Sequence, residues 1–483
     1  MTDFYISFTI HINTMKQKTI TITSIAIAAP LISTGVIHAQ NSNQAKPNVV
    51  FIIADDLGYG DLSCYGQEKF QTPNIDRLAL NGMRFTQCYS GTTVSAPSRC
   101  SLVTGLHTGH AAIRGNKEIK PEGQQPLPAG SSTIFNIFKN AGYTTGAFGK
   151  WGLGFPGSEG EPNKQGVDEF FGYNCQRQAH KYYPQHLWHN RQKVELTDNK
   201  DWNKETYSQD LIQEKALQFM KNNKDNPFFL FVPCVLPHAE LVVPEDSIIQ
   251  KFRGLYPETP YKGDDHGPGY SSQPEPHATF AAMVYRFDMY VGQIVNQLKE
   301  LGIYDNTLII VTSDNGPHME GGADPDFFNS NSIYRGYKRD LYEGGIRVPM
   351  IASWQNHIPE GTQSDLICTF WDMMPTFAQI TGNTAKATDG LSILPTLTGK
   401  GEQKLHNHIY FEFLEMNGKQ ALRKGDWKLI YQDIRKNGYY ELYNLAADPS
   451  ENHNVISLYP EVTKDLKRIM EQEHVDDPMW QLK

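Results

Sequence analysis

The sequence predicts an α/β fold that ends in a small antiparallel sheet, and three observations lead to this prediction. Short, continuous apolar runs of strand length recur between Pro47 and about Gly399. Segments with helical periodicity separate these runs. After about Gly399 the pattern changes to alternating strand-like runs joined by tight turns, which is typical of antiparallel strands.

Three apolar runs, at residues 48–54, 228–232 and 307–312, predict strands that are covered on both faces. The segment 277–302 has apolar residues at near-helical spacing and ends at Gly302, so we expect a helix before the third strand. Ligands bind at the carboxyl ends of strands in such sheets. Asp55-Asp56, Pro237-His238 and Asp314-Asn315-Gly316 follow the three runs, so these polar clusters are candidate site residues.

The last part of the chain predicts a separate small sheet. Strand-like runs cover residues 408–413, 421–432 and 439–445, and a helical stretch runs from Pro460 to about Glu473. Two further segments, residues 263–276 and the aromatic, histidine-rich 173–189, predict long surface loops. Six cysteines without a CxxC pair indicate neither a zinc site nor a disulfide framework.

Composition and charge exclude several classes of protein. The 483 residues include 44 Lys and Arg and 53 Asp and Glu, which gives a formal net charge of −9. Without a long basic run, a nucleic acid is not an expected partner. The hydrophobic content of 39% is typical of an ordered globular protein.

The first residues predict an exported protein. Lys16 and Lys18 precede a mostly apolar stretch at residues 20–37, and Ala39 offers a cleavage point, which is typical of a signal peptide. The alternative is an N-terminal membrane anchor, and either Met1 or Met15 is the true start. We expect a leader and signal peptide at residues 1–39, a catalytic domain at 40–399 and a C-terminal subdomain at 400–483. The mature chain would then lack a membrane span and be periplasmic or extracellular.

The most informative segment is SAPSRCSLVTG, at residues 95–105. Pro97 fits a helix start, so Ser95 would lie at the positive end of a helix, with Arg99 one turn further on and facing the same way. This geometry suits an anion. Taken alone, the segment also fits an ordinary Ser N-cap.

This segment resembles the signature of the type I sulfatases, C/S-x-P-S-R followed by Thr-Gly. Further segments resemble the same family in the same order along most of the chain. They are IADDLGYGDLSCYG, TPNIDRLA, GMRF, GKWGLG, LPH, TSDNG, KRDLYEGGIRVP, GDWKLI and LYNLAADPSE. The resemblance implies an alkaline-phosphatase-like sandwich, in which a large mixed sheet lies between helices.

The resemblance also implies a metal site. Asp55, Asp56, Asp314 and Asn315 match the positions of the family's ligands, together with the signature residue Ser95. Oxygen donors of this kind suit a hard cation. We expect one Ca²⁺ per chain, with Mg²⁺ as the alternative.

The resemblance further implies how the reaction proceeds. A radical-SAM maturase would oxidise Ser95 to formylglycine, whose hydrated aldehyde attacks sulfur and later expels sulfate. Arg99, Lys150 and Lys338 match cationic positions that bind the oxygens of the hydrated aldehyde or of the sulfate. His238, in LPH, matches the histidine near the leaving oxygen and is the expected general acid.

One position departs from the family pattern. The commoner motif GKWHLG has a histidine where this chain has Gly152, so either another residue supplies the base that acts in sulfate release or that step proceeds differently. His107, His110 and His180 are the candidates.

The sequence thus predicts a sulfuric ester hydrolase acting on a sulfated carbohydrate, with a galactose or N-acetylgalactosamine sulfate as the expected substrate. One alternative is a phosphate or phosphonate monoester hydrolase of the same superfamily. The other is a non-catalytic protein that binds sulfated glycans, which unmodified Ser95 would favour.

Overall fold

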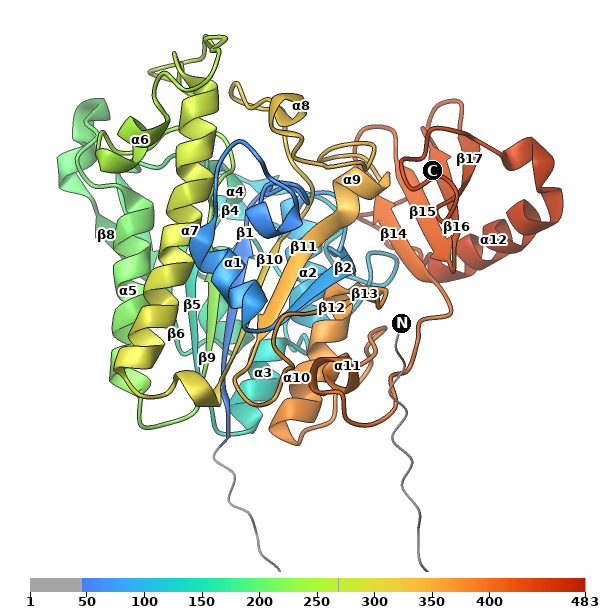
Figure 1. Cartoon of the computed structure of the whole chain (residues 1–483), viewed down its shortest axis with the longest axis horizontal. Helices are drawn as coiled ribbons and strands as arrows, with labels where there is room; N and C mark the ends of the chain where they lie inside the picture. The colour runs from blue at the N-terminus through green and yellow to red at the C-terminus, as the bar shows by residue number, and fades with distance from the viewer. Residues whose placement is uncertain (1–45, 268, 483) are drawn as a thin grey trace, which may run out of the picture. The chain divides into compact units, whose positions relative to one another are not determined.

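The structure is a computed structural model that describes residues 46–267 and 269–482 (Figure 1). Residues 45–483 form one compact unit. The leader and signal peptide predicted at residues 1–39 lie outside the described residues. Within the described residues, no helix is long and apolar enough to cross a membrane.

A mixed sheet of eleven strands forms the centre of this unit. Ten of its strands lie in the order β12-β2-β11-β10-β1-β9-β5-β6-β7-β8, and β13 pairs with β2. The strands are β1 (Asn48–Ala54), β2 (Met83–Tyr89), β5 (Thr144–Lys150), β6 (Glu169–Tyr173), β7 (His186–His189), β8 (Gln192–Glu195), β9 (Phe228–Pro233), β10 (Thr307–Ser313), β11 (Arg347–Ser353), β12 (Thr362–Ser364) and β13 (Cys368–Thr369). The short strands β3 (Glu118–Ile119) and β4 (Gly123–Gln124) form a separate pair.

The three predicted buried strands are confirmed as β1, β9 and β10, and they lie side by side. β1 runs parallel to both β9 and β10, and β5 runs parallel to β9, whereas β11 runs antiparallel to β10. The carboxyl ends of β1, β5, β9 and β10 therefore lie at one edge of the sheet, and this edge carries the candidate site.

Helices cover both faces of the sheet, which confirms the predicted sandwich. The helices are α1 (Pro73–Leu80), α2 (Ser95–Thr104), α3 (Ile134–Asn140), α4 (Gln176–Ala179), α5 (Ser208–Asn223), α6 (Ser247–Phe252), α7 (Pro276–Glu300), α8 (Pro325–Phe328), α9 (Glu343–Ile346), α10 (Met373–Thr381), α11 (Leu394–Thr398) and α12 (Pro460–Glu473). The helix expected at residues 277–302 is α7, which covers one face together with α5 (Figure 1). α2, α3 and α10 cover the other face.

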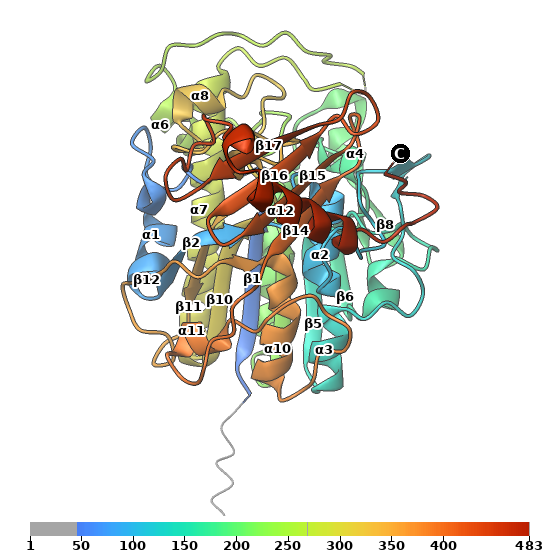
Figure 2. The same cartoon turned by 90° about the vertical axis from the view of Figure 1, so that its right-hand side faces the viewer.

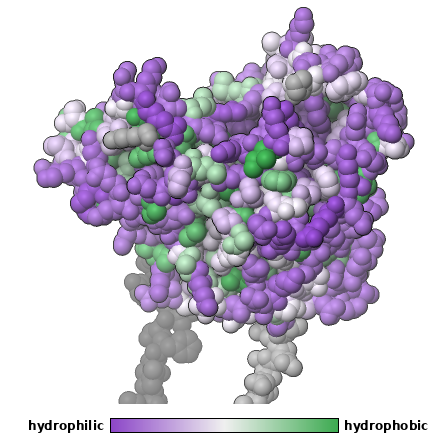
Figure 3. Space-filling model, turned by 180° about the vertical axis from the view of Figure 1, so that it is seen from behind, coloured by the Kyte–Doolittle hydropathy of each residue, from purple (hydrophilic) through white to green (hydrophobic). Residues whose placement is uncertain are grey.

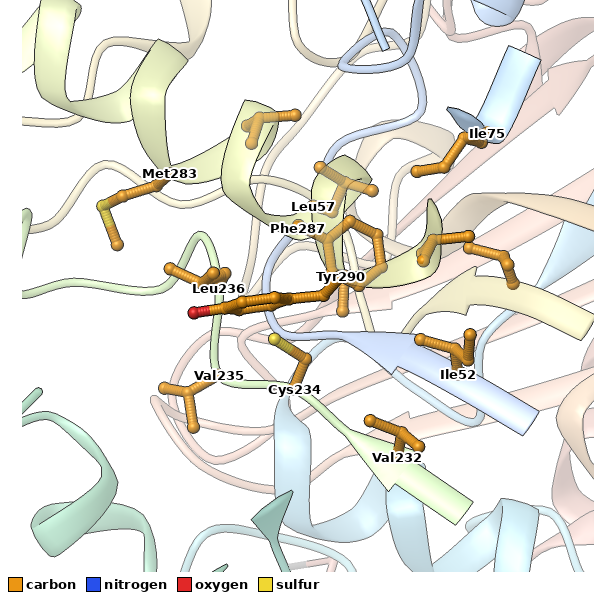
Figure 4. Close-up of a cluster of buried hydrophobic side chains, with 14 of the residues drawn as sticks. Ile52, Leu57, Ile75, Val232, Cys234, Val235, Leu236, Met283, Phe287 and Tyr290 are labelled. Atoms are coloured by element: carbon orange, nitrogen blue, oxygen red, sulfur yellow. The ribbon is translucent and has the colours of Figure 1, made fainter. Parts of the chain in front are cut away.

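Alternate side chains of β1 enter two apolar layers, because successive residues of a strand point to opposite faces. Ile52 packs in the layer that includes Phe287 and Tyr290 of α7 (Figure 4). Phe51 packs in the opposite layer, where its ring meets that of Phe377 from α10 edge to face, with ring centroids 6.1 Å apart. A strand buried on both sides explains why the sequence shows a continuous apolar run rather than an alternating one.

The small C-terminal sheet has the antiparallel order β14-β15-β16-β17, from strands β14 (Ile409–Phe413), β15 (Lys419–Lys424), β16 (Trp427–Gln432) and β17 (Tyr439–Asn444) (Figure 2). Leu466 and Met470 of the terminal helix α12 pack on one face. The other face packs against Tyr89 and Trp371 of the larger part. Because the two parts share an apolar cluster, a domain boundary at residue 399 stays a prediction.

One loop prediction differs from the structure. The aromatic segment 173–189 contains the short helix α4 and the strand β7, which adds to the edge of the large sheet through antiparallel pairing with β6. β7 lies between β6 and β8 in this sheet, and its Leu187 is fully buried. Seen from behind, the surface is mostly hydrophilic, with hydrophobic side chains scattered between polar ones (Figure 3). All six cysteines are free.

Candidate active site

The predicted site residues come from four strand ends, the helix α2 and, for Lys338, the loop between α8 and α9. Asp55 and Asp56 follow β1, Lys150 is the last residue of β5, and Asp314 follows β10. The backbone holds these ends together, because the N–H of Asp314 donates to Ala54 and that of Asp55 donates to Leu236, beyond β9. Side-chain contacts link the nine predicted site residues at this edge of the sheet.

Ser95 lies at the centre of this group and is the first residue of α2. Its hydroxyl donates to Asp55 Oδ1 at 2.9 Å and lies 3.3 Å from Lys150 Nζ. The N-cap is Val94 and no side chain caps this helix, so the local N-cap alternative for Ser95 is wrong. The side chain is 1% exposed and lies at the positive end of the helix dipole.

Arg99 lies one turn further along α2, as predicted, and faces the same carboxylates. Its Nη2 and Nε donate to Asp314 Oδ2 at 3.0 and 3.1 Å, and its Nη1 donates to the carbonyl of Lys150 at 2.8 Å. Such a two-pronged contact fixes both the guanidinium and the carboxylate in one orientation. The guanidinium is almost fully buried, so this orientation is set by the protein rather than by solvent.

The acidic residues and Asn315 form a pocket of oxygen atoms that fits a hard cation. Asn315 Nδ2 donates to Asp56 Oδ1 at 2.7 Å, whereas the buried Asn315 Oδ1 has no hydrogen-bond partner. Asp55, Asp56, Asp314 and Asn315 are all 0% exposed. A buried oxygen without a partner beside three carboxylates is the donor set that Ca²⁺ or Mg²⁺ prefers.

Charge interactions set the protonation states at this site. Burial would raise the pKa of Asp55, but the charges of Lys150, His238 and Arg99 outweigh it and hold that pKa well below its usual range. Burial and the negative charge of Asp55 raise the pKa of Asp314 to about 7. Two carboxylates this close resist ionising together, so a bound cation would favour the fully ionised set.

Lys338 and His238 lie on the opposite side of Asp56. Lys338 Nζ donates to Asp56 Oδ2 at 2.8 Å and lies 3.0 Å from His238 Nε2. Burial opposes the charge on Lys338, but Asp56 and Glu320 outweigh it and raise its pKa. Burial, followed by the charge of Lys338, lowers the pKa of His238 well below its usual range. The proton of this pair therefore lies on Lys338.

Sequence reasoning missed the residues that hold this pair in place. Glu320 Oε2 lies 3.5 Å from Lys338 Nζ and 3.3 Å from His318 Nδ1, and the His318 ring stacks on that of His238 with centroids 5.6 Å apart. His318 and Glu320 follow the predicted ligand Asn315 within five positions. Their closeness in the sequence to Asn315 could have indicated that His318 and Glu320 belong to the site.

The three candidate substitutes for the missing histidine lie in different places. His180 borders the same cavity as Ser95, and its ring stacks on His238 with centroids 4.7 Å apart. His107 and His110 instead contact Glu473, at the end of α12, and Asp389. The structure therefore brings only His180, of these three, into the candidate site.

A cavity of about 450 Å³ opens above Ser95 and gives room for a ligand. Its walls include eight residues that were not predicted as site residues, and of these only Arg339 lies in one of the quoted motifs. They are Asn116, Glu118, Gln124, Gln176, Arg177, Gly269, Tyr270 and Arg339. Polar side chains dominate this wall, so the cavity suits a hydrophilic ligand.

A mixed sheet between helices, with buried carboxylates and cations at its strand ends, defines a hydrolase of the alkaline-phosphatase-like fold. Residues 47–383 match the sulfatase family, and residues 335–476 match the C-terminal part of N-sulphoglucosamine sulphohydrolase. The chain therefore belongs to the sulfatase family, is arylsulfatase A-like, and is a sulfuric ester hydrolase.

Named relatives agree with this assignment. The N-acetylgalactosamine-6-O-sulfatase of Bacteroides thetaiotaomicron is 29% identical over 89% of this chain and 93% of its own length. Arylsulfatase A of Homo sapiens is 28% identical over 88% of this chain and 87% of its own. The solved structure of Ps i-CgsB in complex with k-i-k-neocarrahexaose has a TM-score of 0.75 and 29% identity, and the match covers 91% of this chain and 95% of that one.

Proposed function

We propose that the protein removes sulfate from a sulfated carbohydrate, with Ser95 converted to formylglycine and one Ca²⁺ held by Asp55, Asp56, Asp314 and Asn315. The observation that carries this proposal is the position of the Ser95 hydroxyl. It is buried at a helix N-terminus, within hydrogen-bond distance of Asp55 and Lys150. An ordinary serine in this place would have no base to activate it other than groups that are already paired.

The groups implied by the family supply the nucleophile and part of the charge. A hydrated formylglycine provides an attacking hydroxyl and a second hydroxyl that lets sulfate leave, and a calcium ion neutralises the carboxylates around it. Arg99, Lys150 and Lys338 orient the sulfate group and stabilise the charge that builds on its oxygens. Three buried cations balance the three carboxylates, so a divalent cation leaves the pocket positive, as an anionic substrate requires.

Lys338 and His238 together supply the proton for the departing alcohol. Because His238 Nε2 accepts from Lys338 Nζ, the proton that is available to the leaving oxygen starts on the lysine. His238 then holds the lysine in line with the substrate and can relay its proton. This assignment shares between two residues the role of general acid, which the family resemblance implied for His238 alone.

A carbohydrate fits the rest of the cavity. Its polar wall suits the hydroxyl groups of a sugar, and the relatives named above include an N-acetylgalactosamine-6-O-sulfatase. We therefore infer a galactose or N-acetylgalactosamine sulfate as the substrate. The proposal includes export through the segment at residues 1–39 and modification of Ser95 by a radical-SAM maturase.

The mass of the peptide that contains Ser95, purified from the native host, tests the modification. A peptide lighter by two hydrogens than the unmodified one is expected, and an unmodified peptide in an active protein would contradict the proposed nucleophile. Turnover of phenyl sulfate and phenyl phosphate tests the ester class. Preference for the phosphate would favour the phosphate or phosphonate hydrolase, and sugar binding without any sulfate release would favour the non-catalytic alternative.

A further inference from the structure

Gly152 leaves a space beside the active site, and the side chain of Gln176 fills it. A Cβ atom added at Gly152 would lie 2.4 Å from Gln176 Nε2, which is far closer than van der Waals contact. Gly152 also has φ of +75°, a conformation that other residues adopt only with strain. The chain is therefore built around the Gln176 carboxamide at the place where the family motif has a histidine side chain.

A second carboxamide lies next to the first and faces the same cavity. Gln124 Oε1 accepts a hydrogen bond from the backbone N–H of Gln176 at 3.2 Å, which fixes the orientation of the Gln124 amide and leaves its Nε2 to the cavity side. Both Gln124 Nε2 and Gln176 Nε2 are buried and have no hydrogen-bond partner. The two side chains are 1% and 8% exposed.

Unpaired buried donors of this kind are rare, since each one loses its hydrogen bonds to bulk water without gaining others. Two of them on one wall of a cavity that also holds Ser95 indicate that a ligand completes their hydrogen bonding. We propose that Gln124 and Gln176 form a saccharide subsite, in which their amide N–H groups donate to oxygen atoms of the sugar that carries the scissile sulfate. This inference rests on the proposed function and names the residues that select its substrate.

The three cations and the two carboxamides suit different parts of the substrate, the sulfate and the sugar. In the proposed function the charged donors for the sulfate are Arg99, Lys150 and Lys338, which are held by Asp314, Asp55 and Asp56, so the carboxamides are left for the sugar. The carboxamides are neutral and each offers hydrogen-bond donors, which suits hydroxyl, ring and acetamido oxygens. An aryl sulfate has the same anionic group but none of these oxygens on its ring, so it serves as the comparison ligand.

The test measures binding to protein with unmodified Ser95, made in a host without the maturase, so that it does not depend on catalysis. Calorimetry with galactose and N-acetylgalactosamine sulfates, and with phenyl sulfate, gives the dissociation constants. Gln124→Ala and Gln176→Ala should each weaken binding of the sulfated sugar about tenfold, the usual cost of one lost hydrogen bond of this kind, and phenyl sulfate binding about twofold or less. Gln176→Met, which keeps the volume without the donor, should match Gln176→Ala.

Gln125→Ala is the matched control. Gln125 is adjacent to Gln124, buried, and has an unpaired Oε1, but it does not border the cavity. Its substitution should leave sugar binding within about twofold of wild type, since it removes no donor from the proposed subsite. Gly152→Ala should displace the Gln176 carboxamide and cause the same selective loss, and combining it with Gln176→Ala should add little.

Several results would overturn this subsite. They are equal losses for the sugar and phenyl sulfate, full binding by Gln176→Met, a loss in Gln125→Ala as large as in Gln124→Ala, or no binding of any sulfated sugar by the wild-type protein. Hydrolysis of phenyl sulfate by the matured protein, measured separately, distinguishes this failure from failure of the proposed sulfatase function.

Discussion

Replacing Lys428 by Met should destabilise the protein strongly, because Lys428 is a buried cation between two buried carboxylates. Lys428 lies in β16 and is 1% exposed, with its Nζ 2.9 Å from Glu343 Oε1 and 2.8 Å from Glu451 Oε1. Glu343 also pairs with Arg347 at 3.2 Å. The ion pair thus joins the small sheet to the segment that carries Lys338.

The magnitude follows from the charges left behind. Removing one partner of a buried ion pair costs ~3–5 kcal/mol of unfolding free energy. Burial already raises the pKa of Glu451 to about 7, and the charge of Lys428 counteracts this shift. Without Lys428 that pKa rises further and Glu451 takes a proton in the folded state, so we expect the lower end of this range, about 3 kcal/mol at pH 7.5.

The pH dependence gives a second measure. A carboxyl with a higher pKa in the folded state than in the unfolded state binds more protons when folded, so stability falls as the pH rises between the two values. For Glu451 this window runs from its unfolded pKa near 4.5 to about 7 and extends upward in the variant. The deficit of Lys428→Met should therefore shrink when the pH is lowered from 7.5 to 5.5.

Urea unfolding, followed by circular dichroism at both pH values, measures this effect. Lys424→Met is the matched control, because Lys424 lies in the neighbouring strand and pairs with Asp465 at 2.7 Å, but both side chains are more than 40% exposed. An exposed pair of this kind contributes ~0–1 kcal/mol. A loss below about 1 kcal/mol in Lys428→Met at pH 7.5, or a deficit that does not depend on pH, would refute the argument.

Four further outcomes are expected. Ser95→Ala should abolish sulfate release with an unchanged circular dichroism spectrum. Lys150→Met should lower kcat by a factor of about 10²–10³, because it removes charge stabilisation at the reacting group. Wild-type rates in either variant would contradict these roles. EDTA should lower the thermal unfolding temperature and Ca²⁺ should restore it, since a bound cation stabilises the folded state, whereas an unchanged temperature would argue against the metal site. The hydrogen bond from His107, with burial opposing it, lowers the pKa of Glu473 to about 2, so its stabilisation is present above pH 4.5 and is lost as the pH falls towards 2. Glu473→Gln should remove about 1 kcal/mol of this acid dependence after allowance for solvent screening, and identical acid unfolding curves would exclude the interaction.

The sequence predicted those strands and helices whose burial leaves a pattern of apolar residues within the element itself. The runs that became β1, β9 and β10 are apolar throughout because both faces are covered, and this pattern needs no knowledge of neighbours. The periodicity of α7 likewise follows from one buried face along a single helix. The segment 173–189 was misjudged because β7 is a strand of only four residues between β6 and β8, and its pairing with β6 leaves no local pattern in the sequence.

The role of two of the quoted motifs becomes clear only from contacts in space. The resemblance placed KRDLYEGG and GDWKLI in order along the chain, but gave no reason for Glu343 or Lys428. The structure joins them in one buried ion pair across more than 80 residues. In the same way, Gln124 and Gln176 have no motif of their own, and they become a candidate subsite only because Gly152 leaves room for them.

The sequence alone determined the α/β class, the membership of the sulfatase pattern and the set of charged residues at strand ends, because covalent order fixes which residue follows each strand. Only the tertiary structure decided that the proton of the His238 pair lies on Lys338, that His180 shares the cavity with Ser95 while His107 does not, and that two unpaired amides face that cavity. These properties depend on distances and burial between segments far apart in the chain. Protonation and hydrogen bonding respond to those distances, and a linear pattern does not contain them.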